Sequence, residues 1–193
     1  MAKIIDLKQE LENSINAAFE IDGNQIRLKS ELTIGDIMDL KSVESIINNI
    51  LVVAQACAFA DDIGEPAIKT NISNPNATGF DIKCEKILAE LKATVPCDKN
   101  AKTGEKKYGA NQANSISKDL ENLMGLSDKA TNLGINLANY KKYMVLIDVD
   151  GQRVAFESLL KKEKFRNSPL AVIPIYIDPE KHISDYDEFG WQS

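Results

Sequence analysis

The sequence predicts an α+β fold, with a helix-rich N-terminal two-thirds around a central apolar helix and a small antiparallel sheet near the C-terminus. Two observations support this prediction. Residues 50–60 form an apolar run in which only Gln55 is polar, and the segments 143–149 and 170–177 are rich in the β-branched and aromatic residues that favour strands. The pattern typical of helices therefore lies N-terminal to the pattern typical of strands. We expect a single domain over residues 1–182 and a tail over residues 183–193.

The N-terminal third predicts two helices separated by a short extended piece. Asp6 and Gln9 resemble a capping box, and apolar residues then repeat at helical spacing as far as Ala18. Residues 25–29 follow as the extended piece. Thr33 can cap the central helix, which is apolar almost all round in its second half and therefore belongs in the middle of the fold.

The middle of the chain predicts loops and shorter helices. Glycine, proline and asparagine mark residues 64–79 as a loop. A third helix is expected over residues 81–95, with Cys84, Leu88 and Leu91 facing inward, because Pro96 would end it. The polar segment 98–114 predicts a loop, and two short helices follow Ser115 and Ser127.

The predicted sheet consists of a hairpin and one further strand. Asp150-Gly151 is a two-residue turn signal between β-rich flanks, which predicts a hairpin over residues 143–156. Residues 157–166 are expected to form a basic helix. Residues 170–177 predict a strand at the sheet edge, because Pro174 cannot donate a ladder hydrogen bond.

Composition argues against most catalytic classes. The chain has 193 residues, a formal net charge of −6 and one histidine, His182. A single histidine excludes a His-pair metal site within one protomer, and no phosphate-binding glycine motif is present. We therefore expect no catalytic residue, no cofactor and no enzymatic activity.

The tail is the strongest predicted binding feature, because it contains the only tryptophan of the chain and two other aromatic residues, all close to acidic residues. An alternative is that Trp191 folds back into the protein's own core. The predicted partner-binding residues are Tyr186, Asp187, Glu188, Phe189 and Trp191. A basic patch is predicted to receive this tail, in the same chain or a neighbour, or to bind a polyanion: Lys161, Lys162, Lys164 and Arg166.

These features favour a non-catalytic interaction or structural subunit of a larger bacterial or viral assembly, such as a virion or secretion machinery. Other protein subunits, in a homo- or hetero-oligomer, are the expected partners, and nucleic acid is less favoured. No apolar window reaches the length of a membrane span, so we expect a cytoplasmic protein or one incorporated in a virion or other assembly.

Two alternatives from other classes stay open. Asp61, Asp62 and Glu65 cluster at the end of the central helix, where they oppose the helix dipole. They are weak candidate metal ligands for a carboxylate-dependent divalent-metal enzyme acting on phosphoesters, or else an ordinary solvated helix end. The other alternative is a nucleic-acid accessory protein that uses the basic cluster 161–166.

Overall fold

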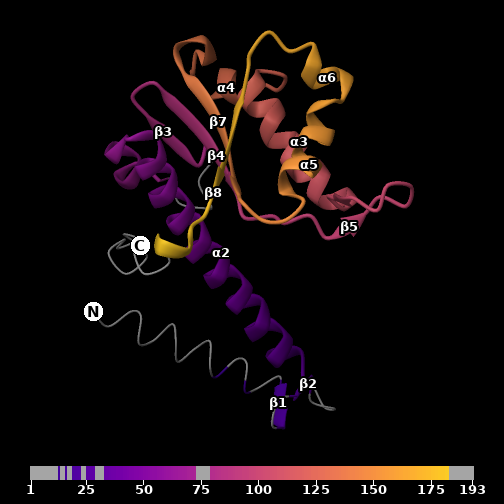
Figure 1. The fold of residues 1–193 in the computed structure, drawn as a ribbon. Helices are drawn as coiled ribbons and strands as arrows, with labels where there is room; N and C mark the ends of the chain where they lie inside the picture. Colours follow the sequence, from indigo (N-terminus) through magenta and orange to yellow (C-terminus); the bar gives the residue numbers. More distant parts are fainter. Residues whose placement is uncertain are drawn as a thin grey trace.

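The computed structural model describes Asn13, Asn16 and residues 19–22, 25–28, 33–72 and 79–182. Its helices and mixed sheet confirm the α+β class (Figure 1). The expected first helix lies largely outside the described residues, and the whole tail 183–193 lies outside them. Among the helices that are described, none has the length and apolar character needed to cross a membrane.

The main sheet has four strands in the order β3-β4-β7-β8, with bounds Ile82–Cys84, Ile87–Lys92, Lys141–Ile147 and Ile173–Ile177. β3 and β4 are antiparallel, whereas β4, β7 and β8 run parallel. An antiparallel bridge between Ile72 and Ile82 extends the sheet beyond β3. The sheet is thus mixed, and the prediction of a purely antiparallel sheet was wrong in this respect.

Helices cover both faces of the sheet (Figure 1). α2 (Ile34–Ile63) packs on one face, and the other face is covered by α3 (Ala110–Met124), α5 (Gln152–Leu160) and α6 (Glu163–Arg166). The remaining short elements are η1 (Pro66–Thr70), α4 (Lys129–Asn132) and η2 (Leu137–Asn139). Two further strand pairs are β1 (Phe19–Asp22) with β2 (Gln25–Leu28), and β5 (Asp98–Lys99) with β6 (Lys106–Lys107).

The two faces of the sheet bury two separate apolar cores. Along β7, Met144 and Leu146 face the core under α3 and α5, while Tyr143 and Val145 face the core under α2. A central parallel strand covered on both sides reads as a continuous apolar run, which is why this segment was predicted as a strand. Phe59 of α2 meets Tyr143 edge to face, with ring centroids 5.1 Å apart.

The central helix was predicted correctly, and the structure shows that it runs as one continuous element. α2 spans 30 residues, and its buried C-terminal half contains the apolar run identified in the sequence. The other end of α2 extends away from the sheet toward β1 and β2 (Figure 1).

Residues 81–95 do not form the expected third helix. They form the β3–β4 hairpin, joined by Glu85 and Lys86, with Glu85 in the left-handed region at φ 38°. The burial of β3 alternates, and β4 is buried on both faces. The apolar residues fit helical spacing as well as strand spacing, and contact with β7 and α2 selects the strand.

The hairpin expected over residues 143–156 is also absent. Gly151, with φ 79°, turns the chain into α5 instead of a second strand. Ala155, Phe156 and Leu159 then bury one helical face. Turn chemistry at Asp150-Gly151 was identified correctly, but it does not determine which element follows.

The edge strand expected over residues 170–177 is confirmed as β8. It is the last strand in the sheet order, and Pro174 lies opposite Met144 in the register with β7. At an edge, the missing proline N–H costs no ladder bond on the open side.

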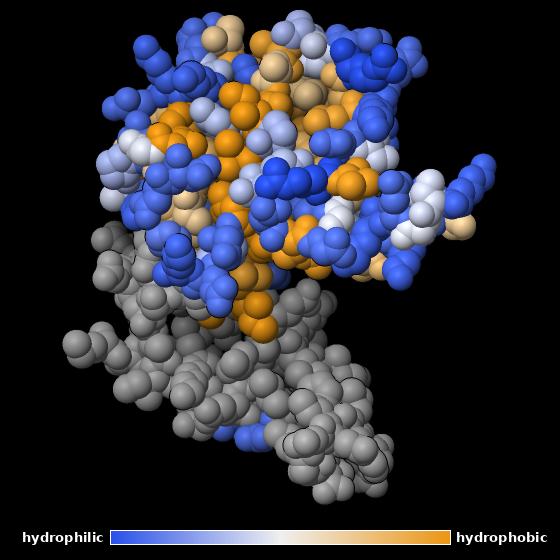
Figure 2. Space-filling model, in the orientation of Figure 1, coloured by the Kyte–Doolittle hydropathy of each residue, from blue (hydrophilic) through white to orange (hydrophobic). Residues whose placement is uncertain are grey.

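Residues 98–107 form a protruding polar arm, built from β5 and β6, where the sequence predicted only a loop (Figure 2). The base of the arm rests on the β7–α5 turn. A Cβ at Gly151 would come within 2.5 Å of the Lys106 Cβ, so this contact requires glycine. The Lys106 ammonium also pairs with Asp150 at 3.0 Å.

Candidate active site

The β3–β4 hairpin brings together charged residues that are distant in the sequence. β3 begins at Ile82, which pairs with Ala89, and continuing this register by one residue would set Asp81 opposite Glu90. Residues directly opposite in an antiparallel pair project to the same face. Lys92 lies two positions beyond Glu90 and therefore shares that face. The Leu91 N–H donates to the Asp81 Oδ2 at 2.7 Å, which fixes the carboxylate beside β4.

Glu90 is an ionisable side chain almost without solvent contact. Its exposed fraction is 3%, and its carboxylate accepts a hydrogen bond from the Lys129 ammonium at 2.9 Å. Burial, followed by the charges of Asp81 and Asp119, raises the pKa of Glu90 to about 8, against the opposing effect of Lys129. A carboxyl with such a pKa holds its proton at neutral pH unless another cation joins it.

Lys92 is held in its charged form. Its ammonium lies 2.6 Å from the Asp119 Oδ2, and both side chains are mostly buried. Burial is the largest influence and lowers the pKa of Lys92, but Asp119, Asp81 and Glu90 together outweigh it, so that the pKa is raised. Lys92 is consequently a fixed positive charge rather than a proton acceptor.

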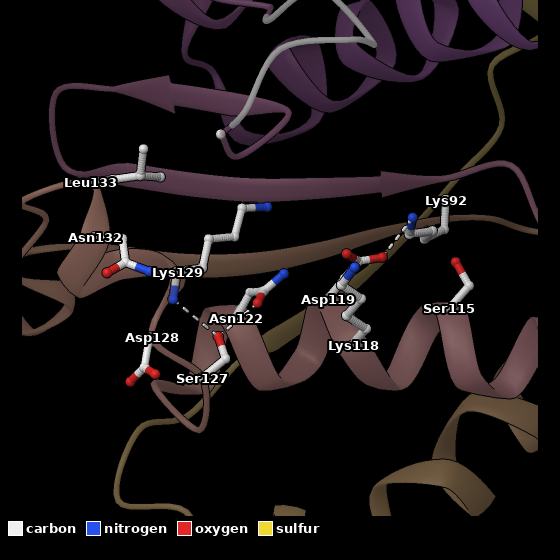
Figure 3. A pocket seen from close by; sticks show the side chains of 11 residues that line it. Lys92, Ser115, Lys118, Asp119, Asn122, Ser127, Asp128, Lys129, Asn132 and Leu133 are labelled. Atoms are coloured by element: carbon white, nitrogen blue, oxygen red, sulfur yellow. Dashed lines mark hydrogen bonds and ion pairs between the residues drawn. The ribbon is translucent and has the colours of Figure 1, made fainter.

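A cavity of about 700 Å³ opens beside these residues (Figure 3). In the close-up, Asp119 of α3 points to Lys92 of the neighbouring strand, and the Lys129 side chain reaches from α4 toward β4. The cavity is lined by Gly79, Lys92, Ser115, Lys118, Asp119, Asn122, Ser127, Asp128, Lys129, Asn132 and Leu133.

α3 supplies one wall of the cavity because it is amphipathic. Its lining residues, Ser115, Lys118, Asp119 and Asn122, are spaced by three, one and three positions and so form one polar stripe. Ile116, Leu120 and Leu123 are buried in the core beneath the sheet. Gly125, in the left-handed conformation, ends the helix at the rim of the cavity.

Glutamines from three helices hold the chain that follows Lys92. Gln55 of α2 donates to the Lys92 carbonyl at 3.0 Å, and Gln152 of α5 donates to the Thr94 carbonyl at 3.2 Å. Gln112 of α3 donates to the Val95 carbonyl at 3.0 Å. Gln55 and Gln152 are fully buried. These bonds fix the end of β4 and hence the position of Lys92.

The acidic end of α2 is organised differently. Asp61 pairs with Lys69 at 2.8 Å and with His182 at 3.4 Å, and its hydrogen bond to Lys69 is the main cause of its lowered pKa. Glu65 accepts a hydrogen bond from the Ala67 N–H at the start of η1. Asp62 is exposed. These groups therefore act as a capped and ion-paired helix end.

Within the ranges described, no group of three or more His, Cys, Asp or Glu residues lies close enough together to hold an ion. A cation at the hairpin would therefore have two protein carboxylates, Asp81 and Glu90, and complete its shell with water. Magnesium is commonly bound in this way, because it retains several of its waters.

The predicted basic cluster lies on and around α6 and is exposed. Lys164 pairs with Glu121 of α3 and lies 4.9 Å from the Phe165 ring centroid. Lys161, Lys162 and Arg166 are also exposed. The partner-binding residues of the tail lie outside the described residues, so docking of the tail on this patch stays a prediction.

Sequence reasoning missed Asp81, Glu90, Lys92, Asp119 and Lys129. A helix over residues 81–95 would have placed Asp81 and Glu90 two and a half turns apart. The signal that could have found them is the alternation of Ile82 and Cys84, followed by a two-residue turn and a buried run. In such a hairpin, Asp81, Glu90 and Lys92 are expected to lie on the same face.

Comparisons with family models, curated proteins and solved structures find no match for this chain.

Proposed function

We propose that this protein is a carboxylate-dependent enzyme that cleaves phosphoesters with the help of a divalent cation. The observation that supports this most strongly is the buried Glu90, which lies two residues from Lys92 and accepts a hydrogen bond from Lys129, because both lysines line a cavity. A strongly perturbed ionisable group at a concave polar site is the usual mark of a catalytic centre.

The charges around the cavity favour an anionic substrate. Lys92, Lys118 and Lys129 line it together with Asp119 and Asp128. Mixed charge of this kind suits a phosphate group that meets lysines on one side and a carboxylate-bound cation on the other. The sequence raised phosphoester chemistry as an alternative for the acidic end of α2, and we transfer it to the hairpin.

Each residue has a distinct role in the proposed reaction. Asp81 and Glu90 would hold the cation, which would polarise the phosphoryl group and activate water. Water attacks phosphorus as the bond from phosphorus to the leaving oxygen breaks, and the proton lost by the water passes to solvent or to the leaving group. Lys92, kept charged by Asp119, stabilises the negative charge that develops on the phosphoryl oxygens.

The interaction role favoured by the sequence is compatible with this activity. Docking through Tyr186, Phe189 and Trp191 would bring the enzyme to a partner without taking part in the reaction. It stays a separate prediction, tested by deleting residues 183–193 and measuring complex formation.

The proposed activity is tested with a panel of a phosphomonoester, a phosphodiester and nucleic acid, each with Mg²⁺ or Mn²⁺. We expect cation-dependent hydrolysis of at least one of them, and Glu90→Gln should lower turnover by about 100-fold. Asp128→Asn is the matched control, because Asp128 is an exposed acid of the same cavity and should leave turnover nearly unchanged. Hydrolysis that is indifferent to Glu90→Gln would overturn the proposal.

A further inference from the structure

We propose that the cavity binds a small phosphomonoester, and that the Asn122 amide and the Lys118 ammonium hold its phosphoryl oxygens. The inference rests on the proposed function, because it names the substrate class of the same cavity. It adds two residues that bind the substrate, and it requires no bound cation.

Asn122 is a nearly buried residue whose amide nitrogen faces the cavity. Its exposed fraction is 5%, and it lines the cavity. The Ser127 hydroxyl donates to the Asn122 Oδ1 at 2.7 Å. Within the described residues this is the one hydrogen bond of its side chain, so the N–H donors of its Nδ2 have no protein partner. In Figure 3 this nitrogen points into the cavity, between Asp119 and Lys129. A ligand that supplies an acceptor would satisfy it.

Ser127 determines which atom of the amide faces the cavity. Its Oγ accepts a hydrogen bond from the Lys129 N–H at 3.4 Å, so its own proton is available to donate to Asn122. A donating hydroxyl requires the amide oxygen on its side, which turns the amide nitrogen to the cavity. The ligand group that meets Asn122 must therefore be a hydrogen-bond acceptor.

Lys118 adds a positive charge one helical turn before Asn122. Residues four apart lie on the same face of a helix, and both residues line the cavity. Lys92 and Lys129 also line it, but each is already paired with a carboxylate. Lys118 is exposed and forms no ion pair with any residue that the structure describes. Its charge is thus left for a ligand.

The acids of the cavity do not oppose an anion at this position. Asp119 is neutralised by Lys92, whose ammonium lies 2.6 Å from its Oδ2. Asp128 forms no ion pair within the described residues, but in Figure 3 its carboxylate points away from the Asn122 amide. An anion between Lys118 and Asn122 would therefore meet donors and a paired carboxylate.

The size and lining of the cavity favour a small phosphomonoester over the other phosphoesters. A monoester presents three terminal oxygens and nearly two negative charges at neutral pH, whereas a diester presents two such oxygens and one charge. The volume of about 700 Å³ suits a small molecule. None of the described residues that line the cavity is aromatic, so no ring is available on which a nucleic-acid base could stack.

Calorimetric titration with glycerol phosphate, in the presence of a metal chelator, tests the binding. Asn122→Asp keeps the bond from Ser127 but replaces the donors with an anion, and it should weaken binding by about 30-fold. Lys118→Met should weaken it by about tenfold. Lys161→Met is the control, because Lys161 is an exposed lysine that does not line the cavity, and it should bind like the wild type.

The same titration with dimethyl phosphate tests the preference for a monoester. The wild type should bind glycerol phosphate about tenfold more tightly than dimethyl phosphate, because the monoester carries more charge and one more terminal oxygen. Equal affinities for the two compounds would overturn the assignment of the substrate class.

A further measurement uses the wild type and does not depend on the folding of a variant. Lysine acylation is followed by mass spectrometry with and without saturating glycerol phosphate. Lys118 should label more slowly when the ester is present, because its ammonium is engaged, while the labelling rate of Lys161 should stay constant. An unchanged rate at Lys118 would overturn the inference.

The two proposals fail in different ways. Cation-dependent hydrolysis that depends on Glu90, with glycerol phosphate affinity equal in the wild type and Asn122→Asp, would contradict the inference alone. Binding of glycerol phosphate that requires Asn122, without hydrolysis of any substrate in the panel, would contradict the proposed function and leave the assigned binding site in place.

Discussion

Two acidic regions of this protein differ in almost every property that matters for chemistry. At the end of α2, Asp61 and Asp62 are adjacent in sequence, exposed, and either ion-paired or solvated. In the β3–β4 hairpin, Asp81 and Glu90 are distant in sequence but opposite in register, and Glu90 is buried. The pKa of Asp61 is lowered by Lys69, whereas burial raises the pKa of Glu90. Clustering along the sequence is therefore a weaker guide to a site than convergence in the fold.

The largest expected difference between the two regions is in activity. Asp81→Asn should lower cation-dependent phosphoester hydrolysis by about 100-fold, because it removes one of the two proposed ligands. Asp61→Asn is the matched change at the end of α2 and should leave turnover unchanged. Steady-state rates on the most active substrate of the panel measure the turnover of both variants. Equal losses of turnover would contradict the proposed difference between the two acidic regions.

The next largest difference is in stability when a lysine is neutralised. Lys92→Met should lower the free energy of unfolding by about 2 kcal/mol, because it leaves the mostly buried Asp119 without its partner. Lys69→Met removes the partner of an exposed carboxylate and should have no measurable effect. Urea denaturation provides both values. A larger loss for Lys69→Met would mean that the α2 end is the more tightly coupled cluster.

Some elements of this fold could be predicted from the sequence, and others could not. The apolar run 50–60 predicted α2, and Pro174 predicted an edge strand, because in both cases one local property decides the outcome. Residues 81–92 and 152–156 were assigned wrongly, since short apolar runs fit either period and only tertiary contacts decide between them. The candidate site depends on the β3–β4 register, and so the misassignment of one hairpin concealed Asp81, Glu90 and Lys92 together.

The pH dependence of stability should differ between the regions. Burial raises the pKa of Glu90 from its ordinary value of 4.5 to about 8 in the fold, so between these values the native state binds more protons than the unfolded state. Stability should therefore fall as pH rises through this window, by up to about 1.4 kcal/mol per pH unit from this group.

Glu90→Gln should remove that slope and make the variant more stable than the wild type at about pH 8. Thermal unfolding across the window, without divalent ions, tests this expectation. Asp61→Asn is the control and should retain the wild-type slope. A wild-type slope in Glu90→Gln would show that Glu90 titrates normally.

The smallest expected effect concerns two glycines with open surroundings. Gly64 follows α2 and Gly134 follows α4, both with positive φ and no atom within 4 Å of a Cβ. Alanine at either position should cost about 1 kcal/mol of stability through backbone strain. Urea denaturation measures both values, and an unchanged free energy of unfolding in either variant would show that the backbone there relaxes without strain.

Anomalous diffraction from crystals soaked in Mn²⁺ tests the central claim most directly, because it locates the ion without reference to activity. The account predicts a peak between the carboxylates of Asp81 and Glu90. A peak at Asp61 and Asp62, with the hairpin carboxylates still bound only to protein groups, would contradict it.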